Sequence, residues 1–404
     1  MFVVILILII GALVFVHELG HFVVARRNGV KASEFGFGFP PRIIGFQFLR
    51  EKPAPGKKSK LFSKWHIIWG AKDGDTESEI SDLHEAHEKQ LIGGTIYSLN
   101  LFPLGGFVRI KGEDGGNKDD FDSFANKSAW KRIKILAAGV AMNFVFAWVL
   151  LSVAFMIGSP EEIDSDANSN NAKSKIQISG IIADAPASLM GFKVGDEISK
   201  IQKKPSGEMV TLKNIKEVQD YINTNKGKEI TLEVLRGKER IISKGTPRID
   251  APEGQGALGV ALSETVLVKY PWYASIWKGA LAVWDMTIMI FVALFGLIKM
   301  LFAGQGGSAD VSGPIGIALI IKEVANLGLV YVIQLAAILS INLGIINILP
   351  IPALDGGRIL FVFIEKIKGS PVNQKVEQAF HAIFFALLLL LMVAVTYKDI
   401  TKFF

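Results

Sequence analysis

The chain has 404 residues, is 50% hydrophobic with a mean hydropathy of +0.37, and carries a net charge of +6. This length argues against one soluble domain, and the hydropathy is high for a soluble protein. There is no cysteine, which excludes disulfides and thiolate metal ligands, and the lysines are spread over hydrophilic stretches, so we expect no nucleic-acid partner.

Residues 1–25 form an apolar run long enough to span a bilayer as a helix. The run lacks the basic start and small-residue cleavage site of a signal peptide, so we interpret it as a retained membrane helix. Arg26 and Arg27 follow it and predict that this end faces the cytoplasm.

The first apolar segment contains His17, Glu18 and His21 in an H-E-x-x-H motif. Residues four apart share one face of a helix, so both imidazoles can reach one ion. Paired imidazoles at this spacing suit zinc, and the glutamate between them suits a general base. A lone histidine near a membrane surface is more often a packed polar residue. Burying ionisable groups at membrane depth costs free energy, however, so such groups are usually functional, which favours the metal site.

Residues 26–130 are expected to form a cytoplasmic-side region. Its stretch 31–50, rich in Gly, Pro and Phe, favours strands and turns, and the charged stretch 51–90 is interpreted as an exposed insertion. His84 and His87 in that insertion are three apart and could bind a metal, although an ordinary surface helix explains them better.

Residues 95–111 predict two short strands around a turn at residues 103–106. Such a hairpin beside the metal helix would offer unpaired backbone groups to an extended peptide, and an ordinary loop hairpin is the alternative. Residues 121–134 are amphipathic and basic, which predicts a segment on the membrane surface. A second transmembrane helix is predicted at 131–158, with its apolar part at 135–157.

Between residues 174 and 262 the sequence becomes β-rich. Strands are predicted at 176–182, 197–201, 229–236 and 239–243, and a helix at 214–223. The phrase ISGIIADAPASLMGFKVGDEISKI resembles a PDZ domain, a fold that binds extended chain ends by strand addition. An unrelated small β domain is the alternative.

A third membrane segment is predicted at 328–357, and it ends in the letters NILPIPALDGG. Two histidines leave zinc under-coordinated, so a third protein ligand is expected beside an open position for water. Asp355 is the strongest candidate because it follows a Pro-rich break, where the next two glycines give the backbone freedom to aim its carboxylate. The alternative is a simple turn in which Asp355 caps a helix beginning near Arg358.

The distribution of basic residues predicts the topology. The lysines and arginine of 358–378 predict a cytoplasmic loop, followed by a last transmembrane helix at 379–396. The β-rich domain is then extracytoplasmic. The helix that precedes Asp355 must run inward to reach the depth of His17. We therefore expect 263–327 to form helices on the outer membrane surface, although its segment 279–302 is apolar enough to cross.

The HELGH stretch in the first membrane helix, NILPIPALDGG in a later one and the PDZ-like domain between them resemble the site-2 protease family. The arrangement is most similar to bacterial members that cleave membrane-anchored anti-sigma factors and signal-peptide remnants. Supporting phrases are FGFGFPPRIIG, NLFPLGGFVRIKGE, AGVAMNF and VSGPIGIA. The chain departs from the family in its charged insertion at 51–90 and in a single PDZ-like unit where some relatives carry two.

The resemblance implies a membrane α-helical bundle of about four transmembrane helices, with a membrane-associated β-hairpin region and an inserted extracytoplasmic PDZ-like α+β domain. It implies a Zn²⁺ metalloendopeptidase of the bacterial inner membrane. Its implied substrates are single-span membrane proteins already trimmed by another protease, within membrane lipid. The site residues that it implies are His17, His21 and Asp355 as zinc ligands, Glu18 as the base that activates water, and Asn347, Pro350, Pro352, Gly105 and Gly106 as substrate-binding positions.

Two other classes of function remain at this stage. An ion transporter could place histidines in the membrane, but it would need polar residues along several helices. A membrane-anchored PDZ adaptor would have no need of Glu18. Zinc content together with a cleavage assay separates the three classes.

Overall fold

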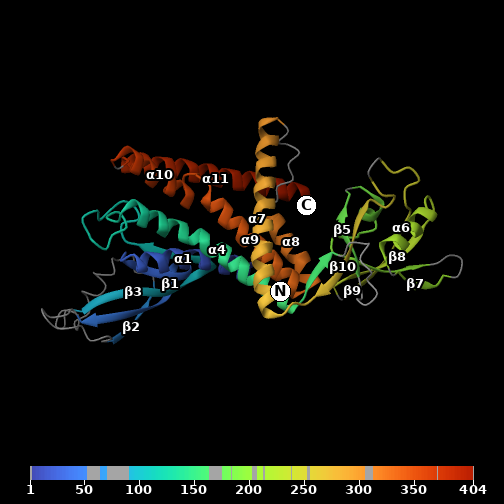
Figure 1. The fold of residues 1–404 in the computed structure, drawn as a ribbon, viewed down its shortest axis with the longest axis horizontal. Helices are drawn as coiled ribbons and strands as arrows, with labels where there is room; N and C mark the ends of the chain where they lie inside the picture. The colour runs from blue at the N-terminus through green and yellow to red at the C-terminus, as the bar shows by residue number, and fades with distance from the viewer. Residues whose placement is uncertain are drawn as a thin grey trace. The chain divides into compact units, whose positions relative to one another are not determined.

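The computed structural model describes residues 2–51, 64–70, 91–162, 175–182, 184–202, 207–212, 214–237, 239–252, 255–304, 313–370 and 372–403 (Figure 1). These residues form two compact units. The first comprises Met1–Leu150, Ala280–Ile321 and Ala336–Phe404, and the second comprises Leu151–Gly279 and Lys322–Leu335. His84 and His87 lie outside the described residues.

Among the described residues, five helices are long and apolar enough to cross a membrane. They are α1 (Phe2–Arg27), α4 (Ala129–Ile157), α7 (Trp272–Phe302), α9 (Leu329–Ile348) and α11 (Gln374–Phe403). Four of them overlap the predicted membrane segments, and α7 contains the segment that we expect on the outer surface. The segment predicted at 328–357 is too long, because α9 ends at Ile348.

Helices α1 and α4 pack closely within the first unit. A Cβ at Gly20 would collide with the carbonyl oxygen of Ala138 and would lie 2.8 Å from Cγ of Met142. Small residues permit such an approach between membrane helices, because lipid supplies no hydrophobic drive and contact must come from close packing. This approach brings α4 against the α1 turn that carries the histidines.

Three strands form the sheet of the first unit, in the order β2-β1-β3. They are β1 (Ala32–Glu51), β2 (Lys64–Trp69) and β3 (Leu91–Ile110). Strand β2 lies in the stretch interpreted as an exposed insertion, so that interpretation was wrong for Lys64–Trp69, which pairs with β1. The aromatic and β-branched residues of KWHIIW are the signal that identifies this strand.

The hairpin prediction for 95–111 was also wrong. Residues 96–99 and 106–109 do not pair with each other, because both flank the same part of β1: Gly36 is the partner of Ser98 and also of Phe107. Two chain segments around a turn were correctly anticipated, but a strand from earlier in the sequence lies between them. Sequence spacing shows a turn, whereas strand pairing depends on which segments meet.

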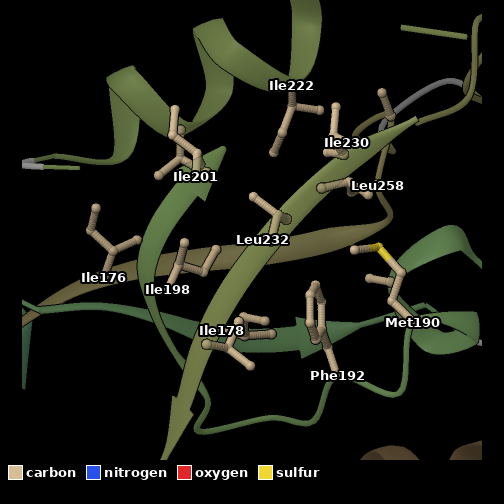
Figure 2. Packing of buried hydrophobic residues seen from close by; sticks show 14 residues of the cluster. Ile176, Ile178, Met190, Phe192, Ile198, Ile201, Ile222, Ile230, Leu232 and Leu258 are labelled. Atoms are coloured by element: carbon tan, nitrogen blue, oxygen red, sulfur yellow. The ribbon is translucent and has the colours of Figure 1, made fainter. Parts of the chain in front are cut away.

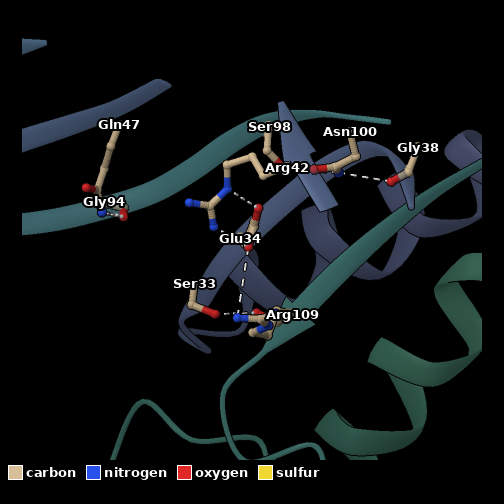
Figure 3. A network of polar contacts seen from close by, with 9 residues as sticks. All are labelled: Ser33, Glu34, Gly38, Arg42, Gln47, Gly94, Ser98, Asn100 and Arg109. Atoms are coloured by element: carbon tan, nitrogen blue, oxygen red, sulfur yellow. Dashed lines mark hydrogen bonds and ion pairs between the residues drawn. The ribbon is translucent and has the colours of Figure 1, made fainter. Parts of the chain in front are cut away.

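Several polar side chains of the sheet are buried, while several of its large apolar side chains are exposed. Figure 3 shows the polar set: Arg42 donates two hydrogen bonds of 2.9 Å to Glu34, and Asn100 donates to the Gly38 carbonyl at 3.0 Å. Exposed side chains on the sheet include Phe46, Trp65, Ile67, Trp69 and Tyr97. A soluble sheet shows the reverse pattern, so an apolar exterior of this kind fits contact with lipid.

The other face of β1 packs on α1 through aromatic rings. Phe22 stacks on Phe35 with ring centroids 4.7 Å apart, and Phe15 lies 5.2 Å from the same ring. The sheet is thereby held beside the helix that carries the H-E-x-x-H motif.

Residues 121–134, predicted to lie on the membrane surface, form turns up to Ser128 and the start of α4 at Ala129, and the placement on the membrane surface stays a prediction. The Ser128 carbonyl accepts hydrogen bonds from the amides of Lys131 and Arg132, which opens the helix. The Asp-, Asn- and Gly-rich sequence before it favours turns over a helix. The basic residues that suggested an amphipathic segment are the first turns of the long helix α4.

The predicted loop at 358–378 is largely helix α10 (Asp355–Lys368). Its apolar side packs inward: Val362 joins a buried cluster with Ile135, Leu136 and Phe124. The charges that suggested a loop lie on its other side or in ion pairs such as Arg132–Glu365. Helix α8 (Pro314–Leu327) also belongs largely to this part of the chain.

The second unit is an α+β domain built on a sheet in the order β4-β10-β5-β6-β8-β9, with β7 paired to β6. Figure 2 shows its core, in which Ile178, Leu232 and Leu258 are almost completely buried. All four predicted strands and the predicted helix are present. The elements are β4 (Ser159–Glu162), β5 (Lys175–Ile181), α5 (Pro186–Leu189), β6 (Glu197–Gln202), β7 (Met209–Thr211), α6 (Ile215–Thr224), β8 (Ile230–Arg236), β9 (Glu239–Gly245) and β10 (Val260–Val268).

Candidate metal centre

Two histidines of α1 and the first residue of α10 meet inside the first unit. Nε2 of His17 lies 3.0 Å from Oδ2 of Asp355, and Nε2 of His21 lies 3.2 Å from the same oxygen. The two Nε2 atoms are 3.2 Å apart. Both histidines are buried, at 7% and 6% exposure, so the three atoms face one another away from solvent.

This triangle fits zinc. Tetrahedral zinc with bonds of about 2.0 Å spreads its ligand atoms about 3.3 Å apart, close to the distances found here. Oδ2 of Asp355 is buried without a hydrogen bond, which is costly for a carboxylate unless a cation faces it. Two imidazole nitrogens and one carboxylate oxygen are also the ligand set of a catalytic zinc site with an open fourth position.

Helix α4 leaves room for the triangle at Gly139. A Cβ at this position would collide with Nε2 of His21 and would lie 2.8 Å from Cε1 of His17. Glycine in a helix interior costs about 1 kcal/mol relative to alanine, so space for the imidazoles is the physical reason for it here.

Asp355 reaches the histidines because α9 ends at Ile348 and a short irregular segment turns the chain into α10. Asp355 does not cap α10: the N-cap is Leu354, and no side-chain capping bond is present. The turn alternative for Asp355 is therefore wrong, because its carboxylate points at the imidazoles.

The two glycines after Asp355 have a different role from the one expected. Both lie in the helix, and a Cβ at Gly356 would collide with the carbonyl oxygen of Ile348, while one at Gly357 would lie 2.8 Å from Cα of Pro352. They permit the start of α10 to pack against the end of α9 and against the irregular segment that follows it. Close packing, rather than backbone freedom, aims the carboxylate.

One contact from α11 supports the irregular segment. The amide of Ala353 donates a 2.7 Å hydrogen bond to Nδ1 of His381. Ala353 has a φ of 80°, a left-handed conformation that is strained for any residue but glycine. His381 thus satisfies a backbone donor in the turn that leads to Asp355.

Glu18 is half-buried beside the ligand atoms, where it interacts electrostatically with His17, His21 and Glu113. Glu113 forms an ion pair with Arg358, one turn after Asp355 on α10. Two cavities of about 950 and 260 Å³ share Glu113 and Arg358 in their walls. The charged wall gives water a polar space next to Glu113, and Glu113 interacts electrostatically with the group expected to act as base.

The remaining predicted site residues lie around this centre in different settings. Asn347 is half-buried in the last turn of α9, Pro350 is exposed and Pro352 half-buried in the segment before α10. Gly105 and Gly106 are buried in β3, where a Cβ at Gly105 would lie 2.8 Å from Cγ1 of Val14. The two glycines therefore also serve close packing of β3 on α1. Substrate binding by all five stays a prediction.

Sequence reasoning missed the residues behind the ligands. Gly139 and Asn143 lie in the phrase AGVAMNF, four residues apart and therefore on one helix face, which was an available signal. Glu113, Arg358 and His381 carried no such signal, because their partners lie far away in the sequence.

The comparisons with known proteins agree with this geometry. The family model for peptidase family M50 matches residues 5–53 and 84–391. Regulator of sigma-W protease RasP of Bacillus subtilis is 30% identical, with 98% of each chain covered, and zinc metalloprotease RasP of Bacillus licheniformis is 32% identical over the same shares. Zinc metalloprotease RasP of Geobacillus kaustophilus is 29% identical over 98% of this chain and 97% of its own.

A zinc metalloprotease with several membrane-capable helices is the class of protein that these findings define. The chain belongs to peptidase family M50, the family of the site-2 proteases that its sequence resembles.

Proposed function

We propose that this chain cleaves the transmembrane segments of single-span membrane proteins inside the lipid bilayer, as a step of regulated intramembrane proteolysis. The observation that supports this best is the buried triangle of His17, His21 and Asp355 beside Glu18, held by helices apolar enough to lie in a membrane. A relative is named a regulator of sigma-W protease, which favours anti-sigma factors as one class of substrate.

In the proposed mechanism His17, His21 and Asp355 hold the metal. Bound zinc supplies a Lewis acid that polarises a carbonyl and makes a water more acidic. Glu18 takes the proton of the attacking water and delivers it to the nitrogen of the leaving amine. Water reaches Glu18 from the polar cavities next to the Glu113–Arg358 pair.

A helical substrate must unwind before attack, since its carbonyls are engaged in internal hydrogen bonds. Strand β3 ends the described sheet on one side, and its residues 106–109 pair with β1. We propose that an unwound substrate adds to this edge, where main-chain hydrogen bonds replace those of its helix. Asn347, Pro350 and Pro352, in the segment that leads to Asp355, would line the other side of the same substrate.

The remaining proposals concern placement. We place the chain in the bacterial inner membrane with about four crossings. The PDZ-like domain, residues 174–262, would lie outside the cytoplasm and admit substrates that another protease has already trimmed. The other proposed divisions are 1–25, 131–158, 328–357 and 379–396 as crossings, 26–130 and 358–378 on the cytoplasmic side, and 263–327 on the outer surface.

The decisive experiment compares the wild-type protein with Glu18→Gln on a single-span test substrate in proteoliposomes. Loss of a general base lowers the rate by about 10²- to 10⁴-fold, while the zinc content should stay the same because Glu18 is not a ligand. Mass spectrometry of the products locates the cut within the substrate's membrane segment. Equal cleavage by both proteins would exclude the proposal. Zinc transport or peptide binding without cleavage would support a transporter or an adaptor instead.

A further inference from the structure

Helix α4 presents a row of three groups to the metal-binding histidines of α1. Ile135, Gly139 and Asn143 are four residues apart, so they lie on one face of α4, as His17 and His21 do on α1. The Ile135 carbonyl lies 2.9 Å from Nδ1 of His21, and the Asn143 amide lies 3.1 Å from Nδ1 of His17. Each imidazole therefore has a contact from α4 on the nitrogen that faces away from the triangle.

The contact at His21 selects the tautomer that ligates. A carbonyl oxygen only accepts, so Nδ1 of His21 must carry its proton and Nε2 presents a lone pair to the triangle. For His17 to ligate in the same way, its Nδ1 must also donate. The group that faces it must then be an acceptor.

Asn143 can supply that acceptor. Its side chain is fully buried, with 0% exposure, and its Oδ1 atom has no hydrogen-bond partner while Nδ2 faces His17. The oxygen and nitrogen of an amide have the same shape, and which is which follows from the hydrogen-bond network. Rotating the amide by half a turn places Oδ1 against Nδ1–H of His17 and moves Nδ2 to the position without a partner. The orientation therefore follows from the proton that a ligating His17 must carry on Nδ1.

The backbone of Asn143 is also tied in place. The hydroxyl of Ser340 on α9 donates a 2.8 Å hydrogen bond to the Asn143 carbonyl, and both residues are fully buried. A Cβ at Gly344 would lie 3.5 Å from Cβ of Asn143, so α9 approaches α4 closely at this level. Two contacts with α9 thus hold the backbone that carries the Asn143 amide.

We propose that Asn143 is a positioning residue that fixes His17 in its metal-ligating tautomer through an Oδ1···H–Nδ1 hydrogen bond. The inference rests on the proposed function only in that zinc is the ion held by His17. Groups that orient a ligating histidine typically change metal affinity by about 10- to 100-fold.

The test measures zinc affinity by competition with a chelator, in the Glu18→Gln background, so that the readout does not depend on cleavage. Asn143→Leu, which removes the acceptor at similar volume, should bind zinc about 10- to 100-fold more weakly, and Asn143→Asp, which keeps an acceptor, should bind near the parent affinity. Equal affinity for all three proteins, or an equal loss in both variants, would overturn the proposal.

A second measurement covers the case in which the leucine variant fails to fold. The ¹⁵N shifts of the His17 ring in the metal-free parent should show the proton on Nδ1, and a proton on Nε2 would contradict the proposal. If zinc affinity responds as expected but the wild-type protein cleaves no membrane substrate, the proposed function fails and the role of Asn143 stands.

Discussion

Nε2 of His17 and Oδ2 of Asp355 lie 3.0 Å apart, although the two residues come from opposite ends of the chain. The contact exists because α1 and α9, the helix that leads to Asp355, both pack against α4. Gly20 permits the close approach of α1, and Ser340 bonds α9 to the Asn143 carbonyl. Helix α4 carries no metal ligand of its own, yet it brings the two halves of the centre together.

Asp355→Ala should remove the third ligand and with it most of the bound zinc. Measured by plasma mass spectrometry on purified protein, the zinc content should fall well below one ion per chain, and cleavage should be lost. Asp220→Ala, at an exposed position of α6 in the second unit, is the matched control and should keep its zinc. Full zinc occupancy in Asp355→Ala would show that the ion is held elsewhere.

Gly139→Ala tests the space that α4 leaves for the imidazoles. The added methyl would displace His21 and press on Cε1 of His17, so zinc affinity should drop, with about 1–3 kcal/mol of destabilisation from overpacking. Gly296→Ala on α7 is the control, because a Cβ there meets no atom within 4 Å. Thermal unfolding and zinc titration of both variants check the prediction, which fails if they behave alike.

His381→Leu removes the acceptor of the Ala353 amide. A buried donor left unpaired costs about 1–3 kcal/mol. The Ala353 amide is half-buried, so we expect the lower part of this range, and the cost falls on the turn that carries Asp355. We expect a lower unfolding temperature together with weaker zinc binding. The unfolding temperature should recover partly when saturating zinc is added, because the ion binds only the folded protein. A variant with unchanged stability would mean that solvent replaces the lost acceptor.

Asp399→Ala tests how α11 holds the start of α8. The Asp399 carboxylate accepts hydrogen bonds from the amides of Gly313 and Gly316, at 3.1 and 2.7 Å. It thus replaces a local cap, whose loss typically costs about 0.5–2 kcal/mol. Asp285→Ala on α7 is an exposed aspartate for comparison and should leave stability unchanged. Chemical denaturation of the two variants side by side measures the difference.

The placement of α7 can be read with cysteines, since the chain has none of its own. Tyr273 and Phe302 lie near the two ends of α7, and both are exposed. A single cysteine at either position can react with a membrane-impermeant maleimide. If α7 lies on the outer surface, both positions should react from outside the cell. Labelling of Tyr273→Cys alone would mean that α7 crosses the bilayer, and α8 would then have to return the chain outward before α9.

Local patterns were enough to identify the long apolar helices, most strands and the candidate metal-binding residues. The apolar runs predict α1, α4, α9 and α11, because a segment that lies in lipid must be apolar and must satisfy its own backbone hydrogen bonds, as a helix does. His17 and His21 share a face through helix geometry alone. Asp355 followed from the chemistry of zinc, which needs a third ligand, and from the break in the helix before it.

Only the tertiary structure decided what surrounds these residues. No pattern within residues 95–111 shows that β1 lies between the two parts of β3. No pattern within the LDGG stretch shows that its glycines leave space for the end of α9 and the segment after it. The groups behind the ligands, Gly139 and Asn143 on α4 and His381 on α11, likewise act through contacts with distant segments. Periodicity is a property of neighbouring residues in one chain segment, whereas close packing and hydrogen-bond partners depend on which segments meet.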